Sequence, residues 1–223
     1  KRIILLGLIL FFGYLVYLNH LVKGTFSSEI QESEKNTRIE YSIETYPAEM
    51  VNMLLLIEDQ SFFQHWGVDF REIVRVLYGY LFEDKDIRGA STITQQLIKN
   101  TLLSSDKTLS RKIDEALMSM LLELNYDKNY ILERYMNTVY LAQQGSIAIH
   151  GFASASQFYF DKSVKDLDLR EMATLVALLK GPSYYHPVKH PDRLNNRLEM
   201  ILSMHNKYKK IWFTLAIRSR PAG

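Results

Sequence analysis

The sequence IEDQSFFQHWG at residues 57–67, together with RGASTITQQLIKN at residues 88–100, decides how the chain is organised. In the first piece an acidic pair follows an apolar segment and precedes two aromatic residues and a histidine. In the second, a Gly-Ala-Ser-Thr turn starts a polar segment that ends in Lys-Asn. Surface loops gain nothing from packing such unlike groups together. We therefore predict that residues 57–100 form one wall of an active-site cleft, which the rest of the chain supports, anchors and completes.

The composition indicates one globular domain with additional segments. The chain has 223 residues, of which 47% are hydrophobic and 23% charged, so it can bury a sizeable core. A net charge of +2 argues against bulk electrostatic binding of nucleic acid. The absence of cysteine excludes disulfide frameworks and thiolate metal sites, but it does not identify the cellular compartment.

The amino-terminal segment indicates a membrane anchor. Residues 3–22 read IILLGLILFFGYLVYLNHLV, long enough to cross a hydrocarbon core of about 30 Å. Lys1 and Arg2 precede it, so the positive-inside rule places the carboxyl-terminal part outside the cytoplasm. A cleaved signal peptide is the alternative, but no alanine occurs before Ala48 to form an Ala-x-Ala cleavage site. We favour a retained anchor over residues 1–23.

The remaining chain is predicted to be mainly α-helical. A linker over residues 24–46, with one extended piece at 38–43, leads to a domain over residues 47–205 and a basic, apolar tail over 206–223. Sustained strand alternation is nearly absent. Thr92 with Gln95, and Asp168 with Glu171, match the capping box that starts a helix. Helices are expected over residues 48–57, around 70–78, from Thr92 to a break at Ser104, over 107–125, after Asp127, over 150–160, up to Lys180, and near 193–204.

Glu58 is the first candidate for chemistry. A carboxylate at the end of an apolar helix, beside Phe62 and Phe63, should be partly desolvated, which would raise its pKa and suit it to accept a proton. An isolated glutamate at a helix end is usually solvated and inert, but Asp59 and His65 favour the functional interpretation. We interpret His65 itself as a structural histidine that bridges its loop to a neighbouring helix. No second histidine or acid lies nearby at metal-ligand spacing, so a zinc site is not expected.

Charged residues downstream admit two interpretations. Arg111 and Glu115 share a helix face nearly opposite the apolar stripe formed by Leu109, Ile113, Ala116, Leu117, Met120, Leu121 and Leu124. Spacing alone predicts a solvated ion pair, and a cleft wall is the alternative. Lys99 and Arg111 could hold a diphosphate or be ordinary surface cations. Ser91 and Thr92 could bind an anion or cap the helix.

Five blocks in order resemble the peptidoglycan glycosyltransferases, which occur as the transglycosylase module of class A penicillin-binding proteins and as monofunctional membrane-anchored enzymes. The resemblance covers about residues 50–200. The blocks are EDQSFFQHWG at 58–67, GASTITQQLIKN at 89–100, RKIDE at 111–115, KNYILERYMN at 128–137, and GFASASQFYF at 151–160 with the later Glu171 and PSYYHP at 182–187.

The resemblance implies a lysozyme-like helical lobe with a smaller lobe against the membrane. It also implies a processive polymerase of lipid II, the undecaprenyl-diphosphate-linked disaccharide-pentapeptide. Glu58 would be the general base that takes the proton from the acceptor's 4-hydroxyl, which attacks the anomeric carbon with inversion and expels the lipid diphosphate. Glu115 would be the second carboxylate, and Lys99 and Arg111 would hold the diphosphate. For Arg111 and Glu115 this replaces the prediction made from spacing.

The resemblance further implies a substrate-binding set in which Ser91, Thr92, Gln96 and Asn100 line the donor side. The full set is Asp59, Phe62, His65, Ser91, Thr92, Gln95, Gln96, Lys99, Asn100, Arg111 and Lys112. No metal ligands and no obligatory cofactor are implied, although a divalent cation is a candidate aid at the diphosphate. The implied partners are lipid II, the nascent glycan strand and the membrane, with other cell-wall synthesis and division proteins as candidates and no nucleic acid. The implied location is the bacterial cytoplasmic membrane, single-pass, with the catalytic domain on the outer side.

Two departures leave alternatives open. Ala142 stands where the family usually has glycine, and Gly145 is a candidate substitute. Residues beyond about 205 match no block and no transpeptidase domain follows, which is expected of a monofunctional enzyme or of a fragment of a bifunctional one. The alternative functions are a lysozyme-like muramidase, against which the Lys99 and Arg111 pair argues, and a non-catalytic membrane scaffold of wall assembly, for which Ala142 is the sequence hint.

Overall fold

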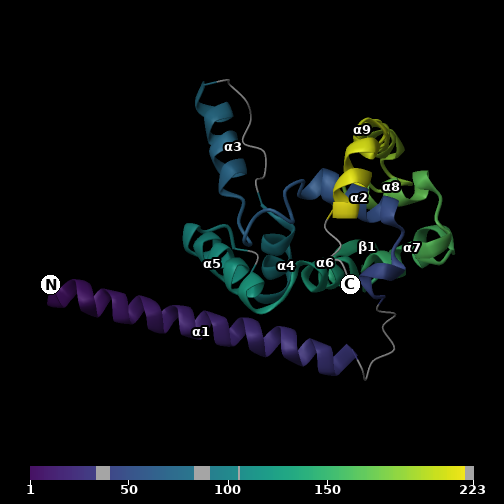
Figure 1. Cartoon of the computed structure of the whole chain (residues 1–223). Coiled ribbons are helices and arrows are strands. Elements are labelled where there is room, and N and C mark those ends of the chain that lie inside the picture. The colour runs from purple at the N-terminus through teal and green to yellow at the C-terminus, as the bar shows by residue number, and fades with distance from the viewer. Residues whose placement is uncertain (34–40, 83–90, 105, 219–223) are drawn as a thin grey trace. The chain divides into compact units, whose positions relative to one another are not determined.

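The computed structural model describes residues 1–33, 41–82, 91–104 and 106–218 (Figure 1). The chain forms two compact units, one of residues 1–38 and 61–135 and the other of residues 39–60 and 136–223. The described elements are predominantly helices, which confirms the mainly α-helical prediction. Of the extended piece expected at 38–43, residues 38–40 lie outside the described residues, and a 3-10 turn, η1 (Ile43–Thr45), follows.

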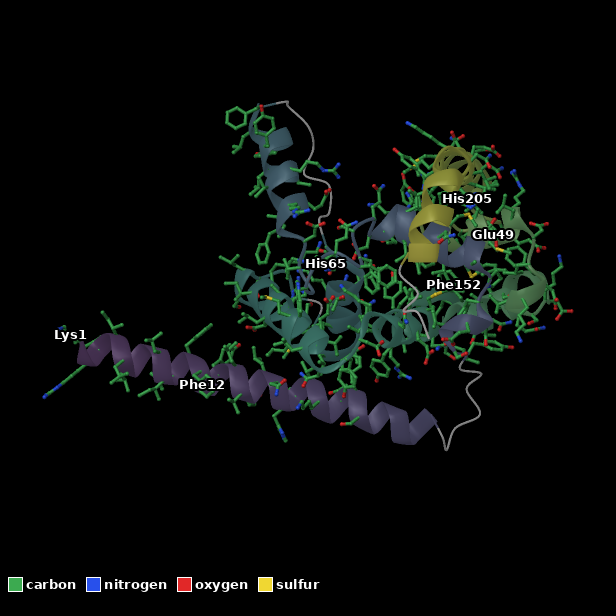
Figure 2. All side chains as sticks on the ribbon, viewed as in Figure 1. Lys1, Phe12, Glu49, His65, Phe152 and His205 are labelled. Atoms are coloured by element: carbon green, nitrogen blue, oxygen red, sulfur yellow. The ribbon has the colours of Figure 1, made fainter. Side chains whose placement is uncertain are left out.

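The first unit begins with the long helix α1 (Arg2–Ser33), which continues into the segment expected to be a linker. Residues Arg2–Ser27 are long and apolar enough to cross a membrane. Most of their side chains are exposed, as Phe12 is in Figure 2. Near the carboxyl-terminal end, Val22 and Phe26 are fully buried, and α1 packs along α5 (Leu109–Asn125).

The other helices of the first unit are α3 (Phe70–Phe82), α4 (Ile93–Leu102) and α6 (Lys128–Thr138), whose residues up to Tyr135 belong to this unit. The predicted capping box at the start of α4 is confirmed, and α4 packs against α5. Asp127 accepts a hydrogen bond from the backbone N–H of Tyr130, as expected of the residue that caps α6.

The faces of α5 are the reverse of those that spacing alone suggests. Leu109 and Leu124 of the predicted apolar stripe are 78% and 67% exposed, whereas Glu115 on the opposite face is 1% exposed. The prediction of a solvated ion pair on the Arg111–Glu115 face is therefore wrong. A helical stripe shows that apolar side chains share a face, but it does not tell which face the rest of the protein covers.

The second unit is built around α2 (Ala48–Glu58), which packs against α8 (Leu169–Leu178) and α9 (Pro191–Arg218). α2 is apolar on nearly every side because its neighbours enclose it: Met50, Met53 and Leu54 have no exposed surface. The capping box predicted at the start of α8 is confirmed. α8 ends two residues before the predicted Lys180, and α9 extends well beyond the predicted 193–204.

A small antiparallel hairpin in the second unit was not predicted. It consists of β1 (Tyr140–Gln144) and β2 (Ile147–His150), and the helix predicted to start at His150 begins only at Phe152 as α7 (Phe152–Phe160). Gly151 separates the two at φ +81, where an added Cβ would lie 2.4 Å from the carbonyl oxygen of Asn137. A positive φ with no room for a side chain explains why glycine ends the strand. Strands this short carry too little alternation to be recognised in the sequence.

Candidate active site

A hydrogen-bond bridge joins the two motifs that open and close residues 57–100. Thr92 Oγ1 accepts from the backbone N–H of Gln95 at 3.1 Å and donates to the carbonyl oxygen of Gly67 at 2.6 Å. Gly67 has φ +80, and a Cβ there would lie 2.5 Å from the backbone of Ser119. Thr92 and Gln95 are 3% and 2% exposed, so these two side chains hold the loop and the helix start together from within.

A charge cluster around the buried Glu115 lies where α4 and α5 begin. Arg111 Nη1 donates to Glu115 Oε2 at 2.8 Å, and Lys112 Nζ donates to Glu115 Oε1 and, at 2.8 Å, to Ser91 Oγ. Two cations surround one carboxylate, so the cluster carries net positive charge. Ser91, Arg111, Lys112 and Glu115, all predicted site residues, are thus brought together.

Arg111 offers a further donor. Its Nε is buried and has no hydrogen-bond partner among the residues that the structure describes. Leaving a buried donor unpaired costs about 1–3 kcal/mol, so such groups call for an explanation. A cationic cluster with a spare donor can bind an anion, and the guanidinium fork suits phosphate oxygens.

The exposed end of α4 carries the other predicted cation. Lys99 and Asn100 are exposed in the last turn, while Gln96 on the same helix accepts a hydrogen bond from the Tyr135 hydroxyl at 2.9 Å. Gln96 is therefore held in place, whereas Lys99 and Asn100 are accessible to a ligand.

The loop before α3 is fixed through His65. Its Nδ1 lies 3.8 Å from Glu123 Oε1 of α5 and 3.4 Å from Lys128 Nζ. The predicted structural bridge from this loop to a neighbouring helix is confirmed. Phe62, 1% exposed, packs edge-on against the His65 ring with centroids 6.1 Å apart. Phe62 therefore supports His65 from the interior.

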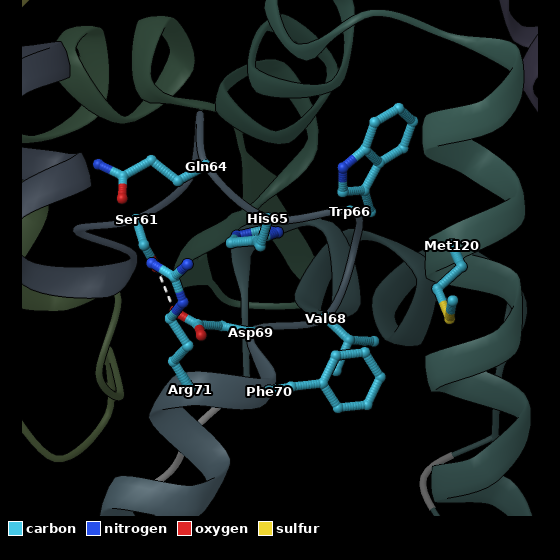
Figure 3. Close-up of a pocket in the computed structure, with 9 residues that line it drawn as sticks. All are labelled: Ser61, Gln64, His65, Trp66, Val68, Asp69, Phe70, Arg71 and Met120. Carbon is cyan, nitrogen blue, oxygen red and sulfur yellow. Dashed lines mark hydrogen bonds between the residues drawn. The ribbon is translucent and has the colours of Figure 1, made fainter.

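A hollow of about 420 Å³ lies beside this loop, within the first unit (Figure 3). The Ser61 hydroxyl donates to the Asp69 carboxylate there. Burial acts to raise the pKa of Asp69, but hydrogen bonds from Ser61 and from the backbone of Glu72, with the nearby His65, outweigh it and hold the pKa below its usual value. The lining residues are Ser61, Gln64, His65, Trp66, Val68, Asp69, Phe70, Arg71 and Met120.

Glu58 and Asp59 belong to the second unit. The Glu58 side chain, 14% exposed at the end of α2, lies 3.9 Å from Arg197 Nη2 of α9. Arg197 is fixed in turn, because its Nε donates to the carbonyl oxygen of Ala177 at 3.1 Å and its guanidinium lies over the Tyr185 ring at 5.3 Å. Sequence reasoning missed Arg197, since no local pattern links a cation on the last helix to an acid on α2. Asp59 is 6% exposed.

Metal binding has no obvious site in the part of the chain that the structure describes. There, no group of three or more histidine, aspartate or glutamate side chains is placed to hold an ion. The described residues thus place a carboxylate beside an arginine in one unit, and a cationic cluster with an unpaired donor in the other.

Comparison with known proteins identifies relatives of this arrangement. The family model described as Transglycosylase matches residues 23–206. Penicillin-binding protein 1B of Haemophilus influenzae is 40% identical over 194 residues, which are 86% of this chain and 25% of that protein. Penicillin-binding protein 1B of Vibrio cholerae is 40% identical over 175 residues, 78% of this chain and 22% of that protein.

Penicillin-binding protein 1A of Neisseria lactamica is 44% identical over 158 residues, 71% of this chain and 19% of that protein. The chain thus spans between about a fifth and a quarter of the length of the curated relatives it matches. These matches confirm the resemblance seen in the sequence blocks and, with the helical content, the lysozyme-like helical class.

Proposed function

Because this chain belongs to the transglycosylase family, we propose that it is a peptidoglycan glycosyltransferase of bacterial cell-wall synthesis that polymerises lipid II into glycan strands. The observation that carries the proposal is the pairing of Arg111 and Lys112 with the buried Glu115, together with the buried, unpaired Arg111 Nε. A lipid diphosphate leaving group needs stabilisation by fixed positive charge as its bond breaks.

In the proposed reaction Glu58 takes the proton from the 4-hydroxyl of the acceptor sugar. The resulting oxygen nucleophile forms a bond to the anomeric carbon of the lipid-linked donor while the bond from that carbon to the diphosphate oxygen breaks. A single displacement inverts the anomeric centre, and undecaprenyl diphosphate leaves with the electron pair. Arg197, 3.9 Å from Glu58, is suited to orient that carboxylate.

Arg111 and Lys112 would neutralise charge on the leaving diphosphate, with Lys99 and Asn100 contributing from the exposed end of α4. Glu115 would hold the two cations in position, since it contacts both of them. No cofactor is required by this scheme, and a divalent cation at the diphosphate is the one candidate aid. The membrane-spanning candidate in α1 supports a single-pass enzyme on the outer side of the cytoplasmic membrane, where lipid II, the nascent strand and other wall-synthesis proteins would be its partners.

The test is to incubate the full chain in detergent with labelled lipid II. We expect glycan strands and free undecaprenyl diphosphate, and inhibition by moenomycin. Release of muropeptides from mature sacculi without polymer from lipid II would instead show a muramidase. Neither product, together with failure to bind moenomycin, would show a non-catalytic scaffold.

A further inference from the structure

A second hollow lies in the second unit, and none of its lining residues has a role in the proposed reaction. It has a volume of about 340 Å³ and is lined by the β1–β2 hairpin, by α7 and by the loop between α8 and α9. Its polar side chains are Tyr140, Gln143, Tyr159, Ser183, His186 and Lys189. The volume falls within the range of small-ligand pockets.

The hollow presents hydrogen-bond donors and positive charge. Lys189 has no ion-pair partner among the described residues, and none of the residues lining the hollow is an acid. His186 Nδ1 accepts from the backbone N–H groups of Val188 and Lys189 at 3.2 and 3.4 Å. Backbone N–H groups can only donate, so Nδ1 carries no proton and Nε2 is the ring's donor. The Ser183 hydroxyl adds a third donor.

The remaining walls add no negative charge and are partly aromatic. The Tyr159 hydroxyl donates to the carbonyl oxygen of Leu141 at 3.2 Å, and burial together with the neighbouring Tyr140 raises the pKa of Tyr159, which keeps the phenol neutral. Gln143 Nε2 is used by the hairpin, where it donates to the carbonyl oxygen of Gly145 at 3.0 Å. A ligand here would meet one cation, two neutral donors and aromatic rings.

We propose that this hollow binds a carboxylate of the stem peptide carried by the glycan substrate. The assignment rests on the proposed function, because that substrate bears a peptide with free carboxylates. A single lysine with two neutral donors matches a singly charged carboxylate, whereas a diphosphate calls for a set such as Arg111 with Lys112. The rings of Tyr140 and Tyr159 suit the aliphatic parts of a peptide.

Binding can be measured without turnover. N-acetylmuramyl pentapeptide is titrated into the full chain in detergent, with the His186 ring resonances as the NMR readout. We expect saturable shifts, binding about tenfold weaker in Lys189→Met, and near-normal binding in Lys189→Arg. Lys165→Met, an exposed lysine outside the hollow, is the matched control. The same peptide with its carboxylates converted to carboxamides should not bind.

Inorganic phosphate tests whether the hollow binds a peptide carboxylate or a phosphate group. If phosphate shifts the His186 resonances at the peptide's concentration and competes with it, the hollow is a phosphate site and the peptide assignment fails. Peptide binding that is unchanged in Lys189→Met, or absent from the wild type, also overturns the assignment.

Kinetics connect the hollow to catalysis. With lipid II we expect Lys189→Met to raise KM about tenfold and to leave kcat within about twofold, because the contact is equal in ground and transition states. Peptide binding in a protein that makes no glycan strands would refute the polymerase and retain the pocket. Polymerisation of lipid II by a protein whose peptide binding does not depend on Lys189 would retain the polymerase and refute the pocket.

Discussion

Glu115 is a carboxylate with 1% of its surface exposed, held between Arg111 and Lys112. A buried ion pair is weak evidence for stability, since taking charges out of water costs several kcal/mol per ion. The side chains of Arg111 and Lys112 are 17% and 43% exposed, so a buried carboxylate is paired with two cations that a ligand can still reach. The unpaired Arg111 Nε supports the proposal that these cations bind an anion.

Replacing Arg111 tests this at the residue scale. Arg111→Met should lower the rate of lipid II polymerisation by about a hundredfold, because it removes the guanidinium proposed to stabilise the leaving diphosphate. Adding Glu115→Gln should restore folding stability by removing the underpaired carboxylate, but it should not restore the rate. Lys165→Met is the control. If Arg111→Met alone polymerises lipid II at a rate within twofold of wild type, the cluster has no role in the reaction.

Asp69 provides a prediction about acid stability. Its pKa is lowered in the folded protein, so its contribution to stability is present above the ordinary aspartate pKa and is lost as the pH falls below about 4. Asp69→Asn should therefore reduce the urea midpoint at pH 6 and flatten its fall toward pH 3.5. Asp106→Asn, an exposed acid, is the control. A variant with the same pH dependence as wild type would contradict the assignment.

Residue-level predictions from sequence succeeded where the signal is local. The capping box of Thr92 and Gln95 was readable because its partners are three residues apart. The ion pair of Arg111 and Glu115 was visible as spacing, but its burial was not, because burial depends on which elements cover α5. Arg197 beside Glu58 depends wholly on tertiary packing and could not be predicted.

At the scale of elements, α4 and α5 hold the cluster and the loop ending at Gly67 fastens to both. Thr92 at the start of α4 donates to the Gly67 carbonyl, and the Gly67 backbone approaches Ser119 of α5. A glycine is required there both by φ +80 and by the lack of space. The motifs at residues 57–67 and 88–100 are therefore joined to each other, and the contact fixes the start of α4.

Gly67→Ala should destabilise this unit by at least about 2 kcal/mol, since it combines a strained φ with a backbone clash. Gly145→Ala is the matched control, because Gly145 has φ +59 but nothing within 4 Å of an added Cβ, so that only about 1 kcal/mol is expected. Urea midpoints followed by far-UV circular dichroism, which reports the helices of both units, give the comparison. Equal losses of stability in Gly67→Ala and Gly145→Ala would show that the protein relieves the clash between the added Cβ and the Ser119 backbone.

Element boundaries show the same division between local and non-local information. Helix starts with capping boxes were predicted correctly at α4 and α8. The β1–β2 hairpin was missed because two strands of five and four residues carry little pattern. The reversed faces of α5 could not be predicted, since apolar side chains can face another helix or a lipid phase as well as a protein core.

At the scale of the whole molecule, the proposed topology rests on the membrane candidate in α1. The sequence contains no cysteine, so single cysteines can report topology without background. In spheroplasts we expect a membrane-impermeant maleimide to label Lys165→Cys and not Lys1→Cys. Wild type, which has no thiol, is the control. Labelling of Lys1→Cys but not of Lys165→Cys would show that the topology is the opposite of the one proposed.

The most direct measurement is the rate at which Glu58→Gln converts lipid II into glycan strands, relative to wild type at equal concentration in detergent. A glutamine cannot accept the proton of the acceptor hydroxyl, so the rate should fall by about a hundredfold to ten-thousandfold, with binding of moenomycin retained. A Glu58→Gln protein that polymerises lipid II at the wild-type rate would contradict the account.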